Sequence, residues 1–499
     1  MINIINRSDF LRRNWSTSLI FALVIIAFFL RFYLIPQHLF FGPEQGIDFL
    51  VVKDIFLNHH LTLIGSKTDV EGIFHGPAYY YLILIPFMLS FGNPIFVSGF
   101  LIVIQSLSVV LMYVLVKEMF NKKVAIISSV VFTFSFGLIA YSRWLSNPPL
   151  SIPISIIFIY FLYRFLKGEK KFLIPLAISF GILGQVEFLN FVFFGFILLV
   201  SFFKYHSLFL KDKIIFFSSI FIAAIFSFGT YLLFDLRHSF LISKSLINLF
   251  AGKSGFHLGV NEIIPAVFNS YIASFSNFTG VFNPLFSIAL FLIGVIVLFK
   301  IFKSFRTEIF LLSLWIFSPV ICLIALRNNP LDHFFLGFYP AYTILLSLTI
   351  YFLLKSRQLQ ILLLSFYIVV SLVAWKTFLP TNKNISFQST QPDLYYSDEV
   401  SVVKNILILS GGKKFQFQPY TIPYWSPDAW DYLFWYYGRS MGYIGSDQSA
   451  DTLFVIIQPD PNNKTFQNDW LKNTVSNWGK DKRSFNIGNI NIKEIKVNK

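Results

Sequence analysis

Charged residues are scarce in this chain of 499 residues. Only 13% of the residues are Asp, Glu, Lys or Arg, whereas 55% are hydrophobic and 64 are Phe. An average soluble domain has about 25% charged residues, because its surface faces water. The composition therefore excludes an ordinary soluble protein and indicates a polytopic α-helical membrane protein.

Cysteine is almost absent as well. Cys322 stands alone, so the chain forms no internal disulfide, and its place in an apolar run indicates a small core residue. The net charge of +15 is strongly basic. Because the Lys and Arg residues are spaced between apolar runs and form no basic arm, we expect no nucleic-acid partner.

Long apolar runs fill the first 380 residues. A membrane-spanning helix needs about 20 mostly apolar residues. The stretch 78–92 is short and contains a proline, so we predict a re-entrant or interfacial segment there, and we place a turn at Gln185. The sequence thus predicts a membrane domain over residues 1–380 with about 11 to 13 transmembrane helices. The eleven predicted spans lie near residues 16–35, 95–116, 124–141, 149–166, 172–185, 187–203, 213–234, 281–300, 308–326, 334–354 and 360–379.

The charges of this region alternate between two sets of loops. Of its 27 Lys and Arg residues, 18 lie in the N-terminal segment and in the loops 117–123, 163–171, 204–213, 300–306 and 355–357. Cytoplasmic loops accumulate these residues, so we expect a cytoplasmic N-terminus on a retained signal anchor in the cytoplasmic membrane. The opposite, extracytoplasmic loops hold nine of the 14 acids: Glu44, Asp48, Asp54, Asp69, Glu71, Glu187, Asp235, Glu262 and Asp332.

Residues 381–499 differ in composition, with 13 basic and 11 acidic residues. The segments 451–460 and 489–497 have the patterns of strands, and we predict a helix that begins with Ser426 as N-cap and Pro427 at the first helical position. These features predict a small extracytoplasmic α/β domain. Trp430, Leu433, Phe434 and Tyr437 recur at helical spacing, which favours packing into a core over stacking on sugars.

Candidate catalytic residues lie in the acid-rich loop 36–77. In FFGPEQGIDFLVVKDI (40–55) Glu44 and Asp48 are four residues apart, so a short helix would place both carboxylates on one face. Ionisable groups near the ends of other predicted spans suggest a shared site at the outer interface, although each alone could be a solvated or interfacial residue. These candidate substrate contacts are Lys53, His75, Tyr79, Arg143, Asn147, Gln185, Glu187, Asp235, Arg237, His238 and His333.

The order of three blocks adds a resemblance. FGPEQGIDFLVVKDIFLNHHLTLIGSKT, then GIFHGPAYYYL, then YSRWLSNPPL resemble the first outer loop and following segments of bacterial integral-membrane glycosyltransferases of the GT-C fold. The similar group is family 39, related to protein O-mannosyltransferases and lipid A aminoarabinose transferases, and the likeness covers about residues 15–240. It implies a polyprenyl-phosphate sugar donor and a general base in the loop, with Glu44 where relatives commonly carry Asp. Ile47 stands where relatives often have a basic residue, so a phosphate contact must come from elsewhere.

The chemistry expected of such a site is transfer with inversion. A carboxylate takes the proton of an acceptor hydroxyl, belonging to a lipid, glycan or protein, while that hydroxyl attacks the anomeric carbon. Arg143, Arg237 and Lys53 are the cations available for the leaving phosphate. We expect no cofactor; a divalent metal held by Glu44, Asp48 and His75 is the alternative.

Three other functions share some of these features. A transporter or flippase of lipid-linked sugars predicts charges near mid-membrane, broken helices and internal symmetry. A polymerase or ligase of lipid-linked oligosaccharides would use the same donor and the same side of the membrane. A non-catalytic scaffold would use the C-terminal domain to bind a partner.

Overall fold

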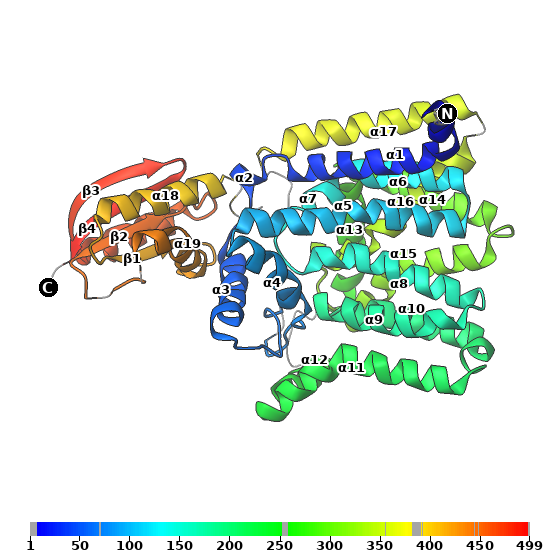
Figure 1. Cartoon of the computed structure of the whole chain (residues 1–499), viewed down its shortest axis with the longest axis horizontal. Coiled ribbons are helices and arrows are strands. Elements are labelled where there is room, and N and C mark those ends of the chain that lie inside the picture. The colour runs from blue at the N-terminus through cyan, green and yellow to red at the C-terminus, as the bar shows by residue number, and fades with distance from the viewer. Residues whose placement is uncertain are drawn as a thin grey trace, which may run out of the picture.

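The computed structural model describes residues 7–68, 71–251, 258–354, 356–381, 391, 393–443, 445–447 and 449–497. A bundle of long helices forms one part of the molecule, and a smaller domain that contains a sheet is attached to one end of it (Figure 1). The N-terminus lies at the far end of the bundle. Of the predicted loop charges, Asp69 and Lys355 lie outside the described residues.

Long helices build the bundle. They are α1 (Arg7–Phe32), α5 (Pro94–Met119), α8 (Ser151–Leu166), α10 (Asn190–Phe209), α11 (Lys213–Arg237), α14 (Pro284–Ile301), α15 (Arg306–Leu326), α16 (Tyr339–Leu353) and α17 (Arg357–Phe378). The other helices of this part are α2 (Ile35–His38), α3 (Pro43–Asn58), α4 (Ala78–Ser90), α6 (Lys122–Phe134), α7 (Phe136–Tyr141), α9 (Leu173–Val186), α12 (Leu241–Phe250) and α13 (Val260–Thr279).

Nine helical segments within the described residues are long and apolar enough to cross a membrane. The chain is therefore a multi-pass membrane protein. The remaining two predicted spans correspond to α6 and α9, which are shorter, so the number of crossings stays a prediction. The predicted turn at Gln185 is observed two residues later, at residues 187–189, because α9 ends at Val186 and α10 begins at Asn190. Cys322 is buried, as predicted for a core residue.

Two predicted spans differ from the observed helices. The span 124–141 forms two helices, α6 and α7, because the helix is interrupted at Ser135. The Ser135 side chain accepts a hydrogen bond from the amide of Leu138 and so caps the N-terminus of α7. The Ser135 hydroxyl also donates to the carbonyl of Phe278 on α13 (2.6 Å). The first span ends early, because Leu34 adopts a left-handed φ of 59° between α1 and α2.

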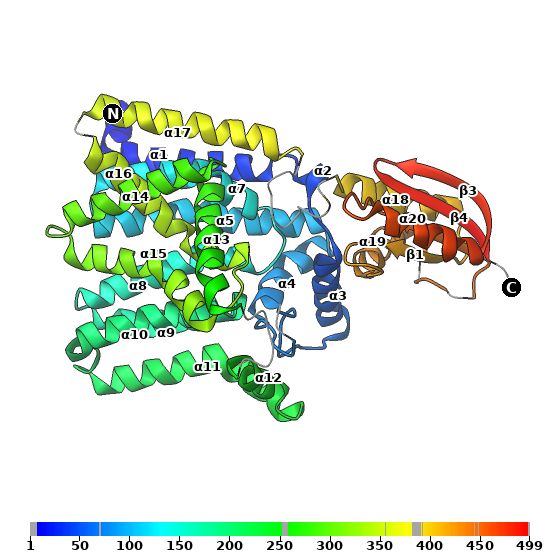
Figure 2. The same ribbon diagram turned by 180° about the vertical axis from the view of Figure 1, so that it is seen from behind.

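The connections of the bundle separate into two ends. The predicted basic loops join helices at the N-terminal end, whereas α2, α3, α4, α12 and the small domain lie at the opposite end (Figure 1). The segment 78–92 forms the short helix α4, which packs against α3, α5 and α9. Helix α13 stands across the long helices (Figure 2). The acid-rich segments and the C-terminal domain therefore share one end of the molecule.

Helix α3 gives the loop 36–77 its main structure. Pro43 at the first helical position fixes a helical φ, and the side chain of Gln45 accepts a hydrogen bond from the amide of Gly42 (3.1 Å). The helix ends at Asn58, after which His59 adopts a left-handed φ of 59°. The local sequence thus places Glu44 in the first turn of α3 and Asp48 one turn later, as the four-residue spacing predicted.

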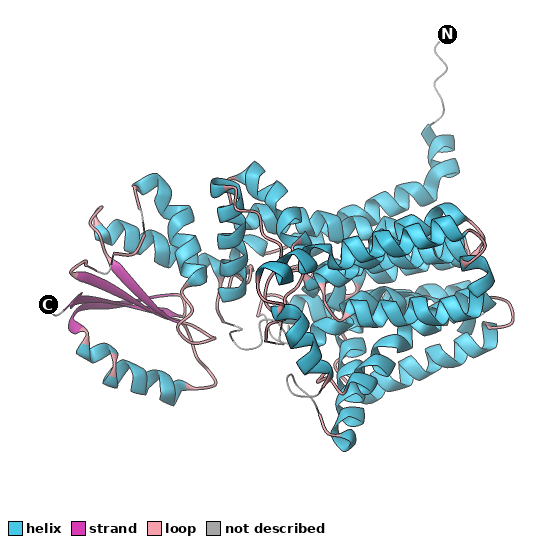
Figure 3. Ribbon diagram, turned by 90° about the horizontal axis from the view of Figure 1, so that it is seen from below, coloured by secondary structure: helices cyan, strands magenta, loops and turns pink. Residues whose placement is uncertain are grey.

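The C-terminal domain comprises residues 391 and 393–497 as far as they are described. Its four-stranded sheet has the order β1-β2-β4-β3, with β1 and β2 parallel and the other pairs antiparallel. Helices lie on both faces of the sheet (Figure 3). The elements are β1 (Gln416–Tyr420), β2 (Thr452–Ile457), β3 (Gly479–Ile487), β4 (Ile490–Val497), α18 (Tyr396–Ser410), α19 (Asp428–Gly438) and α20 (Lys464–Asn473).

The predicted helix of this domain is α19, with one correction. It begins at Asp428 with Pro427 as N-cap, whereas Ser426 donates its hydroxyl to the Asp428 carboxylate and does not cap the helix. Trp430, Leu433 and Phe434 are buried and Tyr437 is half-buried, so the prediction of core packing is confirmed for the first three. The strands predicted in 451–460 and 489–497 are confirmed as β2 and β4.

The C-terminal domain docks on α3 through α19. Gly46 faces the start of α19 so closely that a Cβ atom there would lie 2.2 Å from the amide nitrogen of Ala429. Farther along, Arg439 donates to the carbonyl of Phe91 (2.7 Å) and Tyr432 donates to that of Gly92, both just after α4. The helix that carries the two carboxylates is therefore held from outside by a domain far away in sequence.

Replacing Gly46 by alanine should weaken this docking. The new methyl group meets backbone atoms, which cannot move away as a flexible side chain can, and such overpacking costs about 1–3 kcal/mol. We expect a lower midpoint of thermal unfolding in detergent and faster release of the C-terminal domain by protease. Gly229→Ala is the matched control, because its nearest neighbour would be 3.8 Å away and alanine favours a helix. Equal midpoints for the two variants would contradict the close approach.

Candidate active site

The two carboxylates of α3 have different surroundings. Glu44 is exposed and accepts a hydrogen bond from the hydroxyl of Ser146 (2.5 Å). Asp48 is 0% exposed and accepts one from the hydroxyl of Tyr80 on α4 (2.9 Å). An acceptor arriving from solvent therefore meets Glu44 first, with Asp48 behind it.

Burial raises the pKa of Asp48 well above its ordinary value, and the negative charge of Glu44 raises it further. The hydrogen bond from Tyr80 acts in the opposite direction, because it favours the charged form. Two carboxylates this strongly coupled titrate as a pair. Asp48 therefore binds a proton more readily than an isolated carboxylate on a protein surface does.

The loop of residues 142–147 fixes the first turn of α3. Besides the bond from Ser146 to Glu44, the carbonyl of Leu145 accepts a hydrogen bond from the side chain of Gln45 (3.2 Å). Asn147 donates to the carbonyl of Val186 at the end of α9 (2.5 Å). The loop therefore ties α3 to α9, and Asn147 positions the site through its neighbours.

Two buried arginines meet at the C-terminal end of α1. Arg143 donates to the carbonyls of Arg31 (2.8 Å) and Tyr33, which are acceptors left over at the helix end. Arg31, which is 1% exposed, donates to Ser142 (3.1 Å) and to backbone carbonyls. Burial lowers the pKa of Arg143 to about 9, so its guanidinium stays charged at neutral pH. This end of the site is thus strongly cationic.

His75, Glu187 and His333 form a second polar group beside the same loop. His333 lies 3.7 Å from the Glu187 carboxylate, and its ring is 6.0 Å from that of Trp144. Burial, with the nearby His333, lowers the pKa of His75 to about 3, so its imidazole is neutral. A neutral imidazole can donate or accept a hydrogen bond without adding charge to the site.

Four buried polar atoms of these residues have no hydrogen-bond partner within the part of the chain that the structure describes. They are Asp48 Oδ2, His75 Nδ1, Tyr79 OH and Arg143 Nη2. A buried polar atom without a partner costs about 1–3 kcal/mol, so native proteins rarely keep one without a reason. A polar substrate that reached them would recover this cost.

The other predicted contacts lie elsewhere or have structural partners. Asp235 accepts hydrogen bonds from the amides of Ile242 (2.8 Å) and Ser243 (2.9 Å), so it joins α11 to α12. Arg237 and His238 are exposed at the end of α11. Gln185 donates to the carbonyl of Phe226 on α11 (2.7 Å), and its own backbone carbonyl accepts from Gly76 (2.8 Å).

Lys53 lies at the contact with the C-terminal domain. Its ammonium is 5.0 Å from the ring centre of Trp435, and Asp431 and Asp54 act on it electrostatically. Partial burial lowers the pKa of Lys53, whereas the two carboxylates act in the opposite direction. Lys53 thus belongs to the interface between α3 and α19 more than to the space around Glu44.

Sequence reasoning missed four residues that shape the site: Arg31, Gln45, Ser146 and Tyr80. Three of them stand inside or beside the blocks already singled out, so their positions carried a signal. Their hydrogen-bond partners are about 30 to 110 residues away in sequence, which no local pattern reveals. In the described residues, Glu44, Asp48 and His75 do not come together as a three-ligand metal site.

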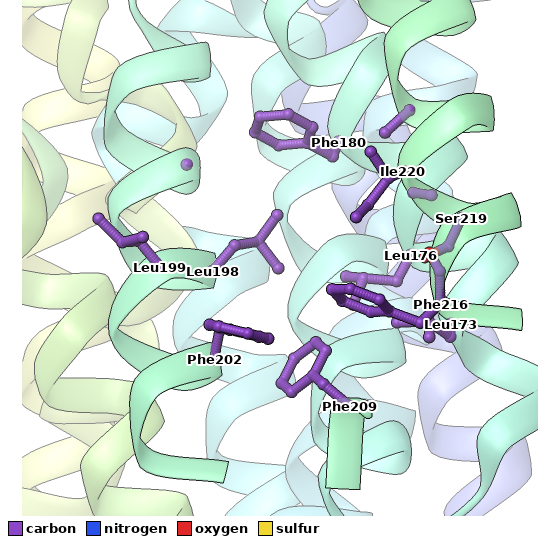
Figure 4. Close-up of a pocket in the computed structure, with 13 residues that line it drawn as sticks. Leu173, Leu176, Phe180, Leu198, Leu199, Phe202, Phe209, Phe216, Ser219 and Ile220 are labelled. Atoms are coloured by element: carbon purple, nitrogen blue, oxygen red, sulfur yellow. The ribbon is translucent and has the colours of Figure 1, made fainter. Parts of the chain in front are cut away.

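A separate apolar cavity of about 350 Å³ lies among α9, α10 and α11 (Figure 4). Its lining includes Leu176, Phe180, Phe202, Phe209 and Phe216. Except for Ser219, these side chains are apolar, so the cavity suits a hydrocarbon chain and offers no chemistry for transfer. The polar site and this cavity are distinct.

The helical bundle, the helix α3 and the domain beyond it together form the GT-C fold of integral-membrane glycosyltransferases. The chain is similar to ArnT from Cupriavidus metallidurans bound to undecaprenyl phosphate, with a TM-score of 0.61 and 9% identity over 96% of this chain and 98% of that one. The apo state of the same ArnT has a TM-score of 0.61 and 9% identity over 97% of this chain and 98% of that one. The apo oligosaccharyltransferase of Archaeoglobus fulgidus has a TM-score of 0.50 and 14% identity over 84% of this chain and 64% of that one. No family model matches the chain, and no curated protein matches it by sequence.

Replacing Asp48 by asparagine should stabilise the protein in a pH-dependent way. The folded-state pKa of Asp48 is raised, so its contribution to stability is present below its ordinary pKa of about 4 and is lost as the pH rises through the raised value. Above that value the wild type buries a charge that asparagine lacks. We expect Asp48→Asn to raise the thermal midpoint more at pH 8 than at pH 4.5.

Asp54→Asn is the matched control on the same helix. Hydrogen bonds from Asn58 and His60 lower the pKa of Asp54, so its contribution is present above its ordinary pKa and lost as the pH falls. The control should therefore lower the midpoint at pH 8 relative to pH 4.5. The same sign for both variants would contradict the burial of Asp48 as a titrating group.

Proposed function

We propose that the protein is an inverting glycosyltransferase that moves a sugar from a polyprenyl-phosphate donor to an acceptor hydroxyl at the outer face of the cytoplasmic membrane. The observation that carries the proposal is the carboxylate pair of α3, with Asp48 buried behind an accessible Glu44. The GT-C fold supports it, because ArnT, of the same fold, was solved with undecaprenyl phosphate.

Glu44 is the proposed general base. The acceptor oxygen forms a bond to the anomeric carbon, the bond from that carbon to the phosphate oxygen breaks, and the acceptor proton passes to Glu44. Asp48, whose pKa is raised by burial and by Glu44, keeps the affinity of the pair for this proton high. Attack from the side opposite the leaving phosphate inverts the anomeric configuration.

Arg143 is the proposed contact for the leaving phosphate. As the bond breaks, negative charge grows on the phosphate, and a fixed cation in a dry site stabilises it. One guanidinium nitrogen of Arg143 binds the end of α1, while Nη2 has no partner among the described residues. Arg237 is exposed at the end of α11, and Lys53 faces the C-terminal domain. Whether a divalent metal assists at the phosphate is tested by adding EDTA to the assay below.

Transfer of labelled sugar from polyprenyl-phosphate sugars to membrane extracts tests the proposal. Glu44→Gln should lower kcat by about 10²- to 10⁴-fold, the usual contribution of a general base. Arg143→Lys should raise KM for the donor, because lysine keeps the charge and loses the forked geometry of the guanidinium. The donor range should include lipid-linked oligosaccharides, since their transfer would indicate a polymerase or ligase.

Glu71→Gln is the control for this assay, because Glu71 is an exposed acid of the same outer segment and lies outside the site. Its activity should equal that of the wild type. Full activity of both Glu44→Gln and Asp48→Asn would remove the carboxylates from the mechanism. Movement of the donor across a vesicle membrane without any new glycosidic bond would favour a flippase.

The proposed orientation can be tested with single cysteines in a Cys322→Ser background. Ser476 is exposed in the C-terminal domain, and Ser304 is exposed in a loop at the opposite end of the bundle. A membrane-impermeant maleimide applied to intact cells should label Ser476→Cys at once and Ser304→Cys only after lysis. The reverse pattern would place the site in the cytoplasm and would refute the proposed side of reaction.

A further inference from the structure

The C-terminal domain has a polar pocket of about 340 Å³ outside the carboxylate site. It lies at the carboxyl ends of the parallel strands β1 and β2, where open α/β sheets commonly bind ligands. Asp460 follows β2, and Lys464 opens α20. On the other side the wall is formed by residues near the start of α18, including Gln391.

The pocket lining suits hydroxyl groups. Four amide side chains line it, those of Gln391, Gln467, Asn468 and Asn489. An amide both donates and accepts hydrogen bonds, as each sugar hydroxyl does. Three of them are already oriented. Gln467 donates to the carbonyl of Gln458 (2.8 Å), Asn489 donates to that of Asp393 (3.1 Å), and Gln391 donates to the carbonyl of Pro459 (3.3 Å).

The charges of the pocket disfavour an anionic ligand. The lining contains two carboxylates, Asp393 and Asp460, and one ammonium, Lys464. Asp460 is buried and accepts a hydrogen bond from Tyr420 (2.7 Å), so a fixed carboxylate stands in the wall. Phosphate groups would meet a net negative charge here, whereas neutral or amino-bearing rings would not.

Three exposed aromatic rings adjoin the pocket. Tyr424, Trp425 and Phe466 pack with ring centres 4.9 to 6.0 Å apart, and each is more than a third exposed. The Tyr424 hydroxyl lies 3.3 Å from the Asp460 carboxylate, which joins this aromatic cluster to the polar wall. Large aromatic faces left in water usually mark a binding surface. The C–H face of a sugar ring can lie on such a surface while its hydroxyls reach the amides.

Segments next to the pocket contact the elements that carry the proposed site. Near the start of α18, Tyr395 packs against His38 of α2, with ring centres 4.5 Å apart. His38 in turn interacts with the charge of Arg143. Tyr424 and Trp425 of the aromatic cluster lie in the loop that leads into α19, whose first residues meet Gly46 of α3, whereas Phe466 lies on α20. A ligand held here is thus attached to the elements that position Glu44.

We propose that this pocket and the aromatic cluster beside it bind the saccharide part of the acceptor, as a neutral or amino-substituted glycan. This inference rests on the proposed function, since it assigns a substrate class to the same reaction. The domain then selects acceptors by their sugar. Because α19 packs on α3, a glycan bound in the pocket is held on the same side of the molecule as the first turn of α3.

Binding of free tetrasaccharides to the full-length protein in nanodiscs tests this directly. The probes are glucose-, mannose-, galactose- and glucosamine-based tetrasaccharides, and the readouts are saturation-transfer NMR and Trp fluorescence. We expect binding of at least one probe to the wild type. Trp425→Ala with Phe466→Ala, and separately Lys464→Ala with Asn468→Ala, should each weaken that binding about tenfold or more.

Lys472→Ala with Asn473→Ala is the matched control, because it makes the same changes in the last turn of α20, away from the pocket lining. It should bind as the wild type does. Glu44→Gln should also keep full binding, so loss of transfer and loss of saccharide binding are separable results. No binding of any probe, equal binding by all variants, or capture of an unglycosylated peptide by the pocket would overturn the proposal.

Discussion

The position of helix α3 is the constraint on which the site depends. On its inner side, Ser146 and Leu145 bind Glu44 and Gln45. On the side that faces the C-terminal domain, Gly46 lets the backbone of α19 approach α3 more closely than any larger residue would allow. In proteins most of the stability of a helix comes from tertiary packing, and α3 packs against α4 and α19. Two separate parts of the chain therefore hold the carboxylates in place.

The acids of the two ends of the bundle have different partners. At the basic end, Glu308 lies 2.8 Å from Lys167 and Asp212 lies 3.2 Å from Lys170, so acids and bases neutralise each other. Asp48 instead takes a hydrogen bond from a tyrosine and stands beside a second carboxylate. Charge left uncompensated costs stability, and proteins keep such costs where chemistry requires them. This contrast separates the structural ion pairs of the basic end from the carboxylates proposed to take part in the reaction.

The C-terminal domain is part of the same machinery rather than an appendage. Its helix α19 packs on α3, Arg439 binds the end of α4, and Tyr395 meets α2. These contacts cover the end of the bundle where the polar groups gather. These contacts hold the domain in a fixed position relative to α3. The proposed glycan ligand and the α3 carboxylates would therefore have the fixed relative geometry that group transfer needs.

Much of this protein follows from its sequence alone, because a membrane leaves few choices. Apolar runs of about 20 residues must become helices, since the backbone has no water to bond, and the Lys and Arg bias predicts their alternation. The spacing of Glu44 and Asp48 set them on one helical face before any contact was known. Sequence could not show that Tyr80 would bind Asp48 or that Asp235 would join two helices. It also could not show that Asn147 and Gln185 would hydrogen-bond to the backbone of neighbouring elements. Those roles depend on which distant atoms become neighbours, and only the tertiary structure decides that, because buried hydrogen bonds form between groups brought together by packing.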